Sequence, residues 1–372
     1  MIPGTRATFI ACLLSASIPF VLGCRGLPAE EPASLHGHSG TLLIVGGGLD
    51  DDCRPVYERF VDLASRRGGA NILIATAATG TQEDEVVDKT EALRVWAPGV
   101  PVHAIRRETP TGETVAAIDA ATAILFTGGD QARITARYRP DDRDTPEWLA
   151  RKRLLARGGV IAGCSAGDAM MGDVMLLGGG SAAALGIALP VKEGEEAPVL
   201  GPRVGPGMHF LPWALTDSHF FERDRVGRLV AALESTHQRL GIGVSEDGCV
   251  EVDLATGELR GVGVSDALLV DVAHLERDGL RRTGLLARVI RQGERVSLTE
   301  ILATTPKRPT PRPDTVRTVP VVEPGQNRQL ASWRLFRTSA LPRAGSESLE
   351  LDGWQVTAWP AAEGEVAFEV GP

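Results

Sequence analysis

The 372-residue sequence is poor in several features that would each point to a class of protein. It has 5 cysteines, too few for a disulfide scaffold of this size, and no Cys-x-x-Cys pair or Cys/His cluster with zinc spacing. It also lacks a basic surplus: 39 Lys and Arg stand against 48 Asp and Glu, a net charge of −9, which argues against non-specific binding to nucleic acid. Hydrophobic content of 43% and charged content of 23% are typical of a folded globular protein.

No apolar run is long enough for a typical membrane-spanning helix, which needs about 20 residues. The nearest case is the N-terminus, where Arg6 is followed by an uncharged, largely apolar stretch at 7–23 that contains Pro19. A basic start, an apolar run and a small residue at the cut form the layout of a secretory signal. We therefore expect residues 1–23 to be a signal peptide.

The residue after the expected cut is Cys24. Val-Leu-Gly-Cys at 21–24 resembles a bacterial lipobox, in which the cysteine becomes the lipidated first residue of the mature chain. This predicts an exported, membrane-anchored lipoprotein in the periplasm or at the cell surface, with residues 24–40 as a tether that lacks periodicity. An ordinary signal peptide with an incidental cysteine is the alternative.

Short apolar runs alternate with helical spacing through the middle of the chain. The expected strands are 41–45, 71–76, 102–105, 121–126 and 159–162, and the expected helices are 54–66, 82–95 and 146–157. Such alternation predicts an α/β fold in three layers, with a mostly parallel sheet covered by helices on both faces. Functional residues are then expected in the loops that follow the carboxyl ends of the strands.

The first of these loops carries three consecutive glycines at 46–48. It lacks the G-x-G-x-x-G pattern and the lysine of a phosphate-binding loop, and the aspartates at 50–52 would repel a phosphate. We interpret it as a tight turn.

The loop after the last predicted strand carries Gly-Cys-Ser-Ala-Gly at 163–167, which fits the G-x-S-x-G pattern. With a strand before it and a helix expected at 168–176, Ser165 fits a strand–turn–helix elbow that exposes the hydroxyl group of a nucleophile. The helix N-terminus would face the developing negative charge. Cys164 is the alternative nucleophile, but the glycine frame favours Ser165.

A serine nucleophile needs a base within hydrogen-bond reach and an acid that orients the base. Five of the 7 histidines lie in the tether, in a predicted strand, at a helix end or beyond the predicted core, which leaves His209 and His219. His219 belongs to Asp-Ser-His-Phe at 217–220, and the short predicted strand at 241–246 ends in Glu246.

Four blocks in this order resemble the cyanophycinases and the related aspartyl dipeptidases, a family of serine peptidases with a class I glutamine amidotransferase-like fold. The blocks are the glycines at 46–48, Phe-Thr-Gly-Gly-Asp-Gln at 126–131, the elbow at 163–167, and 217–220 together with Gly-Ile-Gly at 241–243 and Glu246. The resemblance covers roughly residues 40–275, and we place the peptidase domain at 41–275.

The resemblance implies roles for individual residues and requires no metal or organic cofactor. The implied catalytic triad is Ser165, His219 and Glu246. The implied oxyanion hole is made by backbone N–H groups of Gly129 or Asp130 and of Ala166. The implied substrate-binding residues are Gln131, Asp217, Arg223, Arg225 and Arg228.

Three positions depart from the family pattern and leave the substrate open. Ser218 stands where glutamine is usual, Cys164 where threonine is common, and Asp168 where a small residue is usual. The three arginines are expected on a helix after the histidine, where they could bind substrate carboxylates. The alternative is a solvated helix face whose arginines pair with Glu222 and Asp224.

Residues 276–372 lie beyond the resemblance and form a C-terminal extension. Its segment 304–325 is rich in proline, and we expect it to be extended. Alternating residues at 333–336 and 349–351 predict a few strands, either in a small β unit or in an extension packed on the core.

The leading hypothesis is an exported, lipid-anchored serine peptidase that hydrolyses aspartyl peptide bonds. Its partner would be a peptide or a cyanophycin-like polymer, with the β-aspartyl-arginine repeat as the candidate bond; nucleic acid is not expected, and the membrane is reached only through the lipid. The sequence leaves open whether the protein forms a homodimer. The alternatives are a catalytically silent binding protein on the same fold, or an amidohydrolase that uses Cys164.

Overall fold

A computed structural model describes most of the chain. The described residues are 39–191, 194, 196–319, 331–341, 345–351, 353–361 and 364–372. They belong to a compact unit that spans Leu35–Pro372, whereas a second unit, Met1–Ser34, lies outside the described residues, as does Cys24.

The first sheet carries the predicted parallel strands. Within the described residues its strand order is β15-β11-β10-β1-β5-β4-β2-β3. The parallel strands are β1 (Thr41–Val45), β5 (Val160–Cys164), β4 (Ala123–Phe126), β2 (Ile72–Ala75) and β3 (Val102–Ile105). The antiparallel strands that extend it are β10 (Cys249–Asp253), β11 (Glu258–Gly261) and β15 (Arg295–Ser297).

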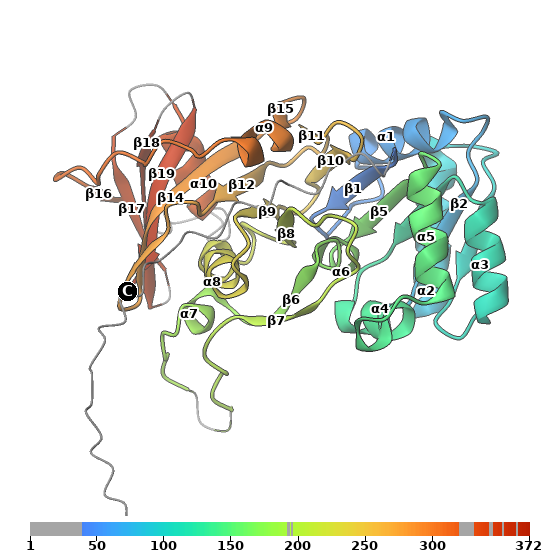
Figure 1. Ribbon diagram of the computed structural model, residues 1–372, viewed down its shortest axis with the longest axis horizontal. Coiled ribbons are helices and arrows are strands. Elements are labelled where there is room, and N and C mark those ends of the chain that lie inside the picture. Colours follow the sequence, from blue (N-terminus) through green and yellow to red (C-terminus); the bar gives the residue numbers. More distant parts are fainter. Residues whose placement is uncertain are drawn as a thin grey trace, which may run out of the picture. The chain divides into compact units, whose positions relative to one another are not determined.

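Helices cover both faces of this sheet (Figure 1). One face packs on α1 (Arg54–Ser65) and α2 (Gln82–Trp96). The other packs on α3 (Thr111–Ala120), α4 (Gln131–Tyr138) and α5 (Pro146–Ala156). The predicted α/β fold with a parallel sheet is therefore confirmed.

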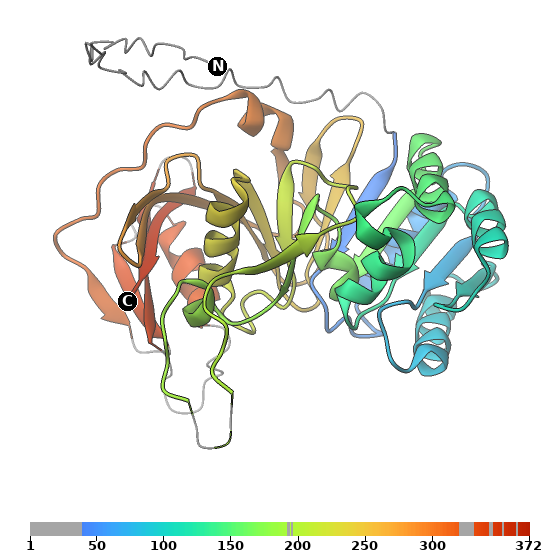
Figure 2. The same ribbon diagram turned by 60° about the horizontal axis from the view of Figure 1, so that its bottom comes forward.

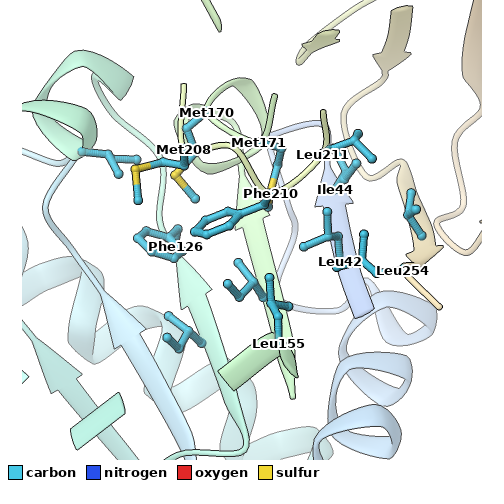
Figure 3. Packing of buried hydrophobic residues seen from close by; sticks show 14 of the residues in the cluster. Leu42, Ile44, Phe126, Leu155, Met170, Met171, Met208, Phe210, Leu211 and Leu254 are labelled. Carbon is cyan, nitrogen blue, oxygen red and sulfur yellow. The ribbon is translucent and has the colours of Figure 1, made fainter. Parts of the chain in front are cut away.

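Strand residues alternate between the two cores. Leu43 and Val45 point toward α1, whereas Leu42 and Ile44 belong to the opposite core, and all four are at most 1% exposed. Figure 3 shows Leu42 and Ile44 in that opposite core, where Phe126 and other large apolar side chains gather. Full burial of one such aliphatic side chain contributes roughly 1.5–3 kcal/mol, so apolar strands covered on both faces form a stable scaffold.

A second sheet, mostly antiparallel, holds the remaining strands after residue 213, whereas β10, β11 and β15 belong to the first sheet. In the described part of the chain its order is β16-β17-β18-β19-β14-β12-β9-β8, and β13 pairs with β14. The strands are β8 (Ala214–Asp217), β9 (Leu240–Val244), β12 (Ala267–Asp271), β13 (Glu276–Asp278), β14 (Arg281–Ile290), β16 (Arg317–Val319), β17 (Glu347–Leu351), β18 (Trp354–Pro360) and β19 (Glu365–Gly371). Helices α8 (Val226–Thr236) and α10 (Ala331–Ser339) share its apolar core (Figure 2).

Most strands after residue 276 complete this second sheet, because β14 pairs with β12 on one side and with β19 on the other. The exception is β15, which pairs with β11 in the first sheet. The strand expected at 333–336 is wrong, since these residues lie in α10. The buried residues of α10 include Ala331, Leu335 and Ser339, spaced four apart, so a helix buries them on one face. The short α9 (Leu298–Ala303) follows β15. Of the proline-rich segment 304–325, residues 304–316 contain no helix or strand, 317–319 form β16, and 320–325 lie outside the described residues.

The helix expected at 168–176 is also wrong. Helix α6 (Ala166–Ala169) is a single turn, and the chain continues as strand β6 (Val174–Gly178), which pairs with β7 (Arg203–Pro206). The backbone groups of β6 find partners far along the chain, and helical spacing cannot reveal such partners. Helix α7 (Ser181–Ala184) follows β6. No helix among the described residues is both long and apolar enough to cross a membrane.

Candidate active site

Ser165 lies at the carboxyl end of β5, directly before α6. Its φ is 55°, a left-handed value that strains a residue with a side chain and is typical of a nucleophile elbow. The flanking glycines are needed for close packing: a Cβ on Gly163 would lie 2.1 Å from Gly167 O, and one on Gly167 would lie 2.8 Å from Phe126 O. The G-x-S-x-G frame thus lets the strand and the short helix meet at Ser165.

The structure brings the three residues of the expected triad together. Ser165 Oγ lies 2.9 Å from His219 Nε2, and His219 Nδ1 lies 2.6 Å from Glu246 Oε1. His219 follows β8 and Glu246 follows β9, two parallel neighbours whose carboxyl ends meet at one edge of the second sheet. With Nδ1–H donating to the carboxylate, Nε2 is free to accept the hydroxyl proton of the serine.

The side chain of His219 is 11% exposed. Burial lowers its pKa below the ordinary value, the hydrogen bond to Glu246 opposes this, and the positive charges of Arg223 and Arg225 lower the pKa further. The ring is therefore neutral at neutral pH, which is the form that a general base requires.

Two of the expected substrate-binding residues are instead paired with each other in the interior. Asp217 has no exposed surface and Arg228 is 5% exposed. Their contact is bidentate: Arg228 Nε donates to Asp217 Oδ2 at 2.7 Å, and Nη2 donates to Oδ1. The two charges neutralise each other within this buried ion pair, so neither side chain is exposed to a substrate.

Arg225 also points inward. Its Nη1 donates to the carbonyl oxygen of Ser218 at 2.5 Å, and burial lowers the pKa of its guanidinium to about 10. This arginine holds the backbone immediately before His219. Arg223 is exposed, and its charge acts on the imidazole, so it is the arginine of the three that remains accessible to a substrate.

The three arginines were expected on one helix, but that helix begins only after Arg223 and Arg225. Helix α8 starts at Val226, and residues 219–225 form turns because His219 and Asp224 have positive φ values of 46° each. Arg223 and Arg225 therefore lie before the helix rather than on its face. Gln131, the first residue of α4, donates its side-chain N–H to Leu176 O, which ties it to β6.

One of the expected oxyanion-hole donors is already used. The N–H of Asp130 donates to Ala78 O at 3.1 Å, and the Asp130 side chain caps α4 by accepting from Ala132 N–H at 2.9 Å. The N–H groups of Gly129 and Ala166 have no acceptor among the described residues. Of the expected donors, these two N–H groups are the ones left for an oxyanion.

The alternative nucleophile does not suit its position. Cys164 is 8% exposed and belongs to the core under α1. Burial raises the pKa of its thiol to about 11, which keeps it protonated and unreactive. Cys53, Cys164 and Cys249 are all free and buried, so the described residues form no disulfide.

Two carboxyl groups beside the site, Asp168, which is buried, and Glu222, which is half-buried, escaped the sequence analysis as functional candidates. Asp168, on α6, has no exposed surface and neither carboxyl oxygen has a hydrogen-bond partner among the described residues. Burial raises the pKa of its carboxyl well above the ordinary value and thereby favours the protonated form. Burial also raises the pKa of Glu222, and the charges of Glu246 and Asp247 add to that rise. The only sequence feature that pointed to either group was Asp168 itself, which stands where the family usually has a small residue.

Comparisons with known proteins identify the family of this chain. The sequence profile described as peptidase family S51 matches residues 42–258. A cyanophycinase of Synechococcus elongatus is 27% identical over 252 residues, covering 66% of this chain and 72% of the relative. A cyanophycinase of Nostoc sp. is 29% identical over 246 residues, covering 63% of this chain and 75% of the relative.

A solved structure, a peptidase from an acI-B1 Actinobacterium, is similar in fold. It has a TM-score of 0.50 and 19% sequence identity, and the alignment covers 71% of this chain and 99% of that chain. The profile match extends over more than half of the chain and includes Ser165, His219 and Glu246. The chain belongs to peptidase family S51 and is a cyanophycinase-like serine peptidase.

Proposed function

We propose that this peptidase hydrolyses aspartyl peptide bonds with Ser165 as nucleophile, His219 as general base and acid, and Glu246 as the acid that orients the imidazole. The observation that carries the proposal is the chain of two contacts, 2.9 Å from Ser165 Oγ to His219 Nε2 and 2.6 Å from His219 Nδ1 to Glu246 Oε1. The strained elbow and the neutral imidazole support the same roles.

The reaction would proceed in two halves. Ser165 Oγ attacks the scissile carbonyl carbon while His219 Nε2 takes the hydroxyl proton, and the N–H groups of Gly129 and Ala166 stabilise the oxyanion. The imidazolium then donates its proton to the leaving amine, and an acyl-enzyme ester remains. Water, deprotonated by His219, attacks this ester and releases the acid with Ser165 restored. Removal of one oxyanion donor typically costs about 10²–10³ in rate.

The proposed substrate is an aspartyl peptide, with the β-aspartyl-arginine repeat of cyanophycin as the specific candidate. The names of the two cyanobacterial relatives support this substrate. Arg223 stands exposed near His219, where it can receive a substrate carboxylate. The net charge of −9 would attract an arginine-rich polymer to the protein.

The test compares the full-length protein with Ser165→Ala and Cys164→Ala on cyanophycin and on β-Asp-Arg, with release of products measured by chromatography. We expect Ser165→Ala to lose the activity, leaving at most a residual about 10³–10⁴-fold above the reaction in water, and Cys164→Ala to keep activity. A wild-type protein that hydrolyses no aspartyl peptide contradicts the proposed substrate. Loss of activity in Cys164→Ala alone contradicts the proposed nucleophile.

The location and assembly form a separate part of the proposal: export, lipid attachment at Cys24, and a homodimer. Val-Leu-Gly-Cys at 21–24, after an apolar stretch, supports lipid attachment. Metabolic labelling with a fatty acid should mark the wild-type protein and not Cys24→Ser. Equal labelling of the two proteins would overturn lipid attachment at this residue, and light scattering of the purified protein would decide between monomer and dimer.

A further inference from the structure

The three glycines after β1 (residues 46–48, here the glycine turn) contact two other segments of the site, the one that carries His219 and the one that carries Glu246. The backbone N–H of His219 donates to Gly46 O at 2.6 Å. The N–H of Asp247, in the segment after β9, donates to Gly47 O at 3.2 Å. The turn is therefore hydrogen-bonded both to the segment of the histidine and to the segment of the orienting acid.

Gly47 packs directly against the imidazole. A Cβ at this position would lie 2.4 Å from both Cε1 and Nε2 of His219, a separation that real Cβ atoms essentially never show. Nε2 is the ring atom that meets Ser165 Oγ. A methyl group on Gly47 would therefore occupy the space of the ring edge that faces the nucleophile. The φ of +100° at Gly47 is a further strain for any residue with a side chain.

Gly48 packs against the orienting acid in the same way but less tightly. Its Cβ would lie 3.0 Å from Cδ and 3.1 Å from Oε2 of Glu246, and its φ is +53°. The Glu246 side chain is 40% exposed and its end is flexible, so it can move aside. A methyl group here should disturb the site less than one on Gly47.

The imidazole cannot yield as easily as the glutamate. His219 is buried, its own φ of 46° is left-handed, and its N–H is held by Gly46 O. A displaced ring would also lose the 2.6 Å contact with Glu246. The ring must therefore leave either the serine or the carboxylate when its space is reduced.

We propose that Gly47, and to a lesser degree Gly48, are positioning residues of this site: their missing side chains leave the space in which His219 and Glu246 stand. The effect on rate rests on the proposed function, whereas the contact between Gly47 and the imidazole does not. From the sequence alone, the glycine turn is interpreted only as a tight turn. Its positioning role depends on His219 and Glu246, which the second sheet places against it.

The first experiment compares each glycine with a matched control. Gly68 has a φ of +105° and Gly279 a φ of +58°, and a Cβ on either would meet no atom within 4 Å. We expect Gly47→Ala to lower kcat by about 100-fold with KM little changed, since a displacement of about 1 Å can cost that much. Gly48→Ala should lose less. Gly68→Ala and Gly279→Ala should keep kcat, because they share the backbone strain without the contact.

The second experiment measures the contact without catalysis. Gly47→Ala is made in the wild-type chain and in a His219→Ala background, and Tm is recorded for all four proteins. We expect the loss of Tm to be larger when the imidazole is present. If Gly47→Ala alone does not fold, recovery of folded protein in the double variant gives the same result.

Together, the two experiments distinguish a failure of the positioning role of Gly47 from a failure of the proposed function. A Gly47→Ala protein with the kcat of Gly68→Ala, and with the same loss of Tm in both backgrounds, overturns the positioning role. A wild-type protein that is inactive on every aspartyl peptide contradicts the proposed function instead, and the Tm cycle still decides whether Gly47 leaves the space for the ring.

Discussion

The two sheets contribute different parts of the site. The first sheet, built from consecutive strand–helix units, presents Ser165 at the end of β5. The second, assembled from segments spread between residues 214 and 371, presents His219 and Glu246 at the ends of β8 and β9. The nucleophile and its base therefore meet across the junction of two sheets, and the distance between them depends on how that junction is held.

The chain crosses this junction at the orienting acid. Glu246 lies between β9 of the second sheet and β10 of the first, and the N–H of Gly46 donates to Gly248 O at 3.1 Å within the same crossing. Changes at His219 or Glu246 on the second-sheet side should therefore alter proton transfer. Changes on the first-sheet side that touch neither the elbow, the glycine turn nor Gly129 should alter stability alone.

The largest effect should come from Glu246→Gln. Loss of the carboxylate removes the acceptor that sets the imidazole tautomer, and kcat should fall by about 10⁴-fold. Glu246 raises the pKa of His219, so its loss lowers that pKa further and moves the acid limb of the pH–kcat/KM profile to lower pH. Glu258→Gln, an exposed carboxylate that pairs with Arg295, is the control and should change neither quantity. An unshifted acid limb would argue against contact with the imidazole.

Asp217→Ala should affect folding more than binding. It leaves the guanidinium of Arg228 buried without its partner, which should cost about 3–5 kcal/mol in the free energy of unfolding, measured with urea. Asp62→Ala removes exposed ion pairs on α1 and should cost less than about 1 kcal/mol. If Asp217→Ala unfolds like the wild type but has a raised KM, Asp217 is a substrate contact, as the family resemblance implied.

The contrast between the sheets also explains what the sequence could predict. Strand β1 matches its predicted bounds because it is a short apolar run bounded by turns, and β3 matches its predicted bounds as well. The helix expected at 168–176 is wrong because β6 pairs with β7, and no local pattern encodes that partner. In the same way, the elbow around Ser165 is a local motif. The burial of Asp217 against Arg228 depends on a turn with left-handed residues that helical spacing does not predict.

Asp168→Asn tests whether a change on the first-sheet side alters stability without altering catalysis. The wild-type carboxyl has a raised pKa in the folded protein, so folding must keep it protonated and stability falls as pH rises above the unfolded pKa of about 3.9. The amide has the same shape and no charge, so the variant should be more stable at pH 7, by about 1–3 kcal/mol. This advantage should disappear below pH ~3.9, where both states of the wild type are protonated. Thermal unfolding at several pH values measures it, and the acid limb of activity should not move.

Arg223→Ala should give the smallest effect and the one most specific to the junction. The positive charge of Arg223 lowers the pKa of His219, so its removal should move the acid limb of kcat/KM upward, opposite to Glu246→Gln. A raised KM for peptides with a free carboxylate should accompany it, because this guanidinium is exposed beside the site. Arg143→Ala, which is exposed and paired with Asp141, controls for loss of a surface charge. If both arginine variants behave alike, the second sheet supplies the imidazole and its acid without a substrate contact, and recognition must come from the first-sheet side.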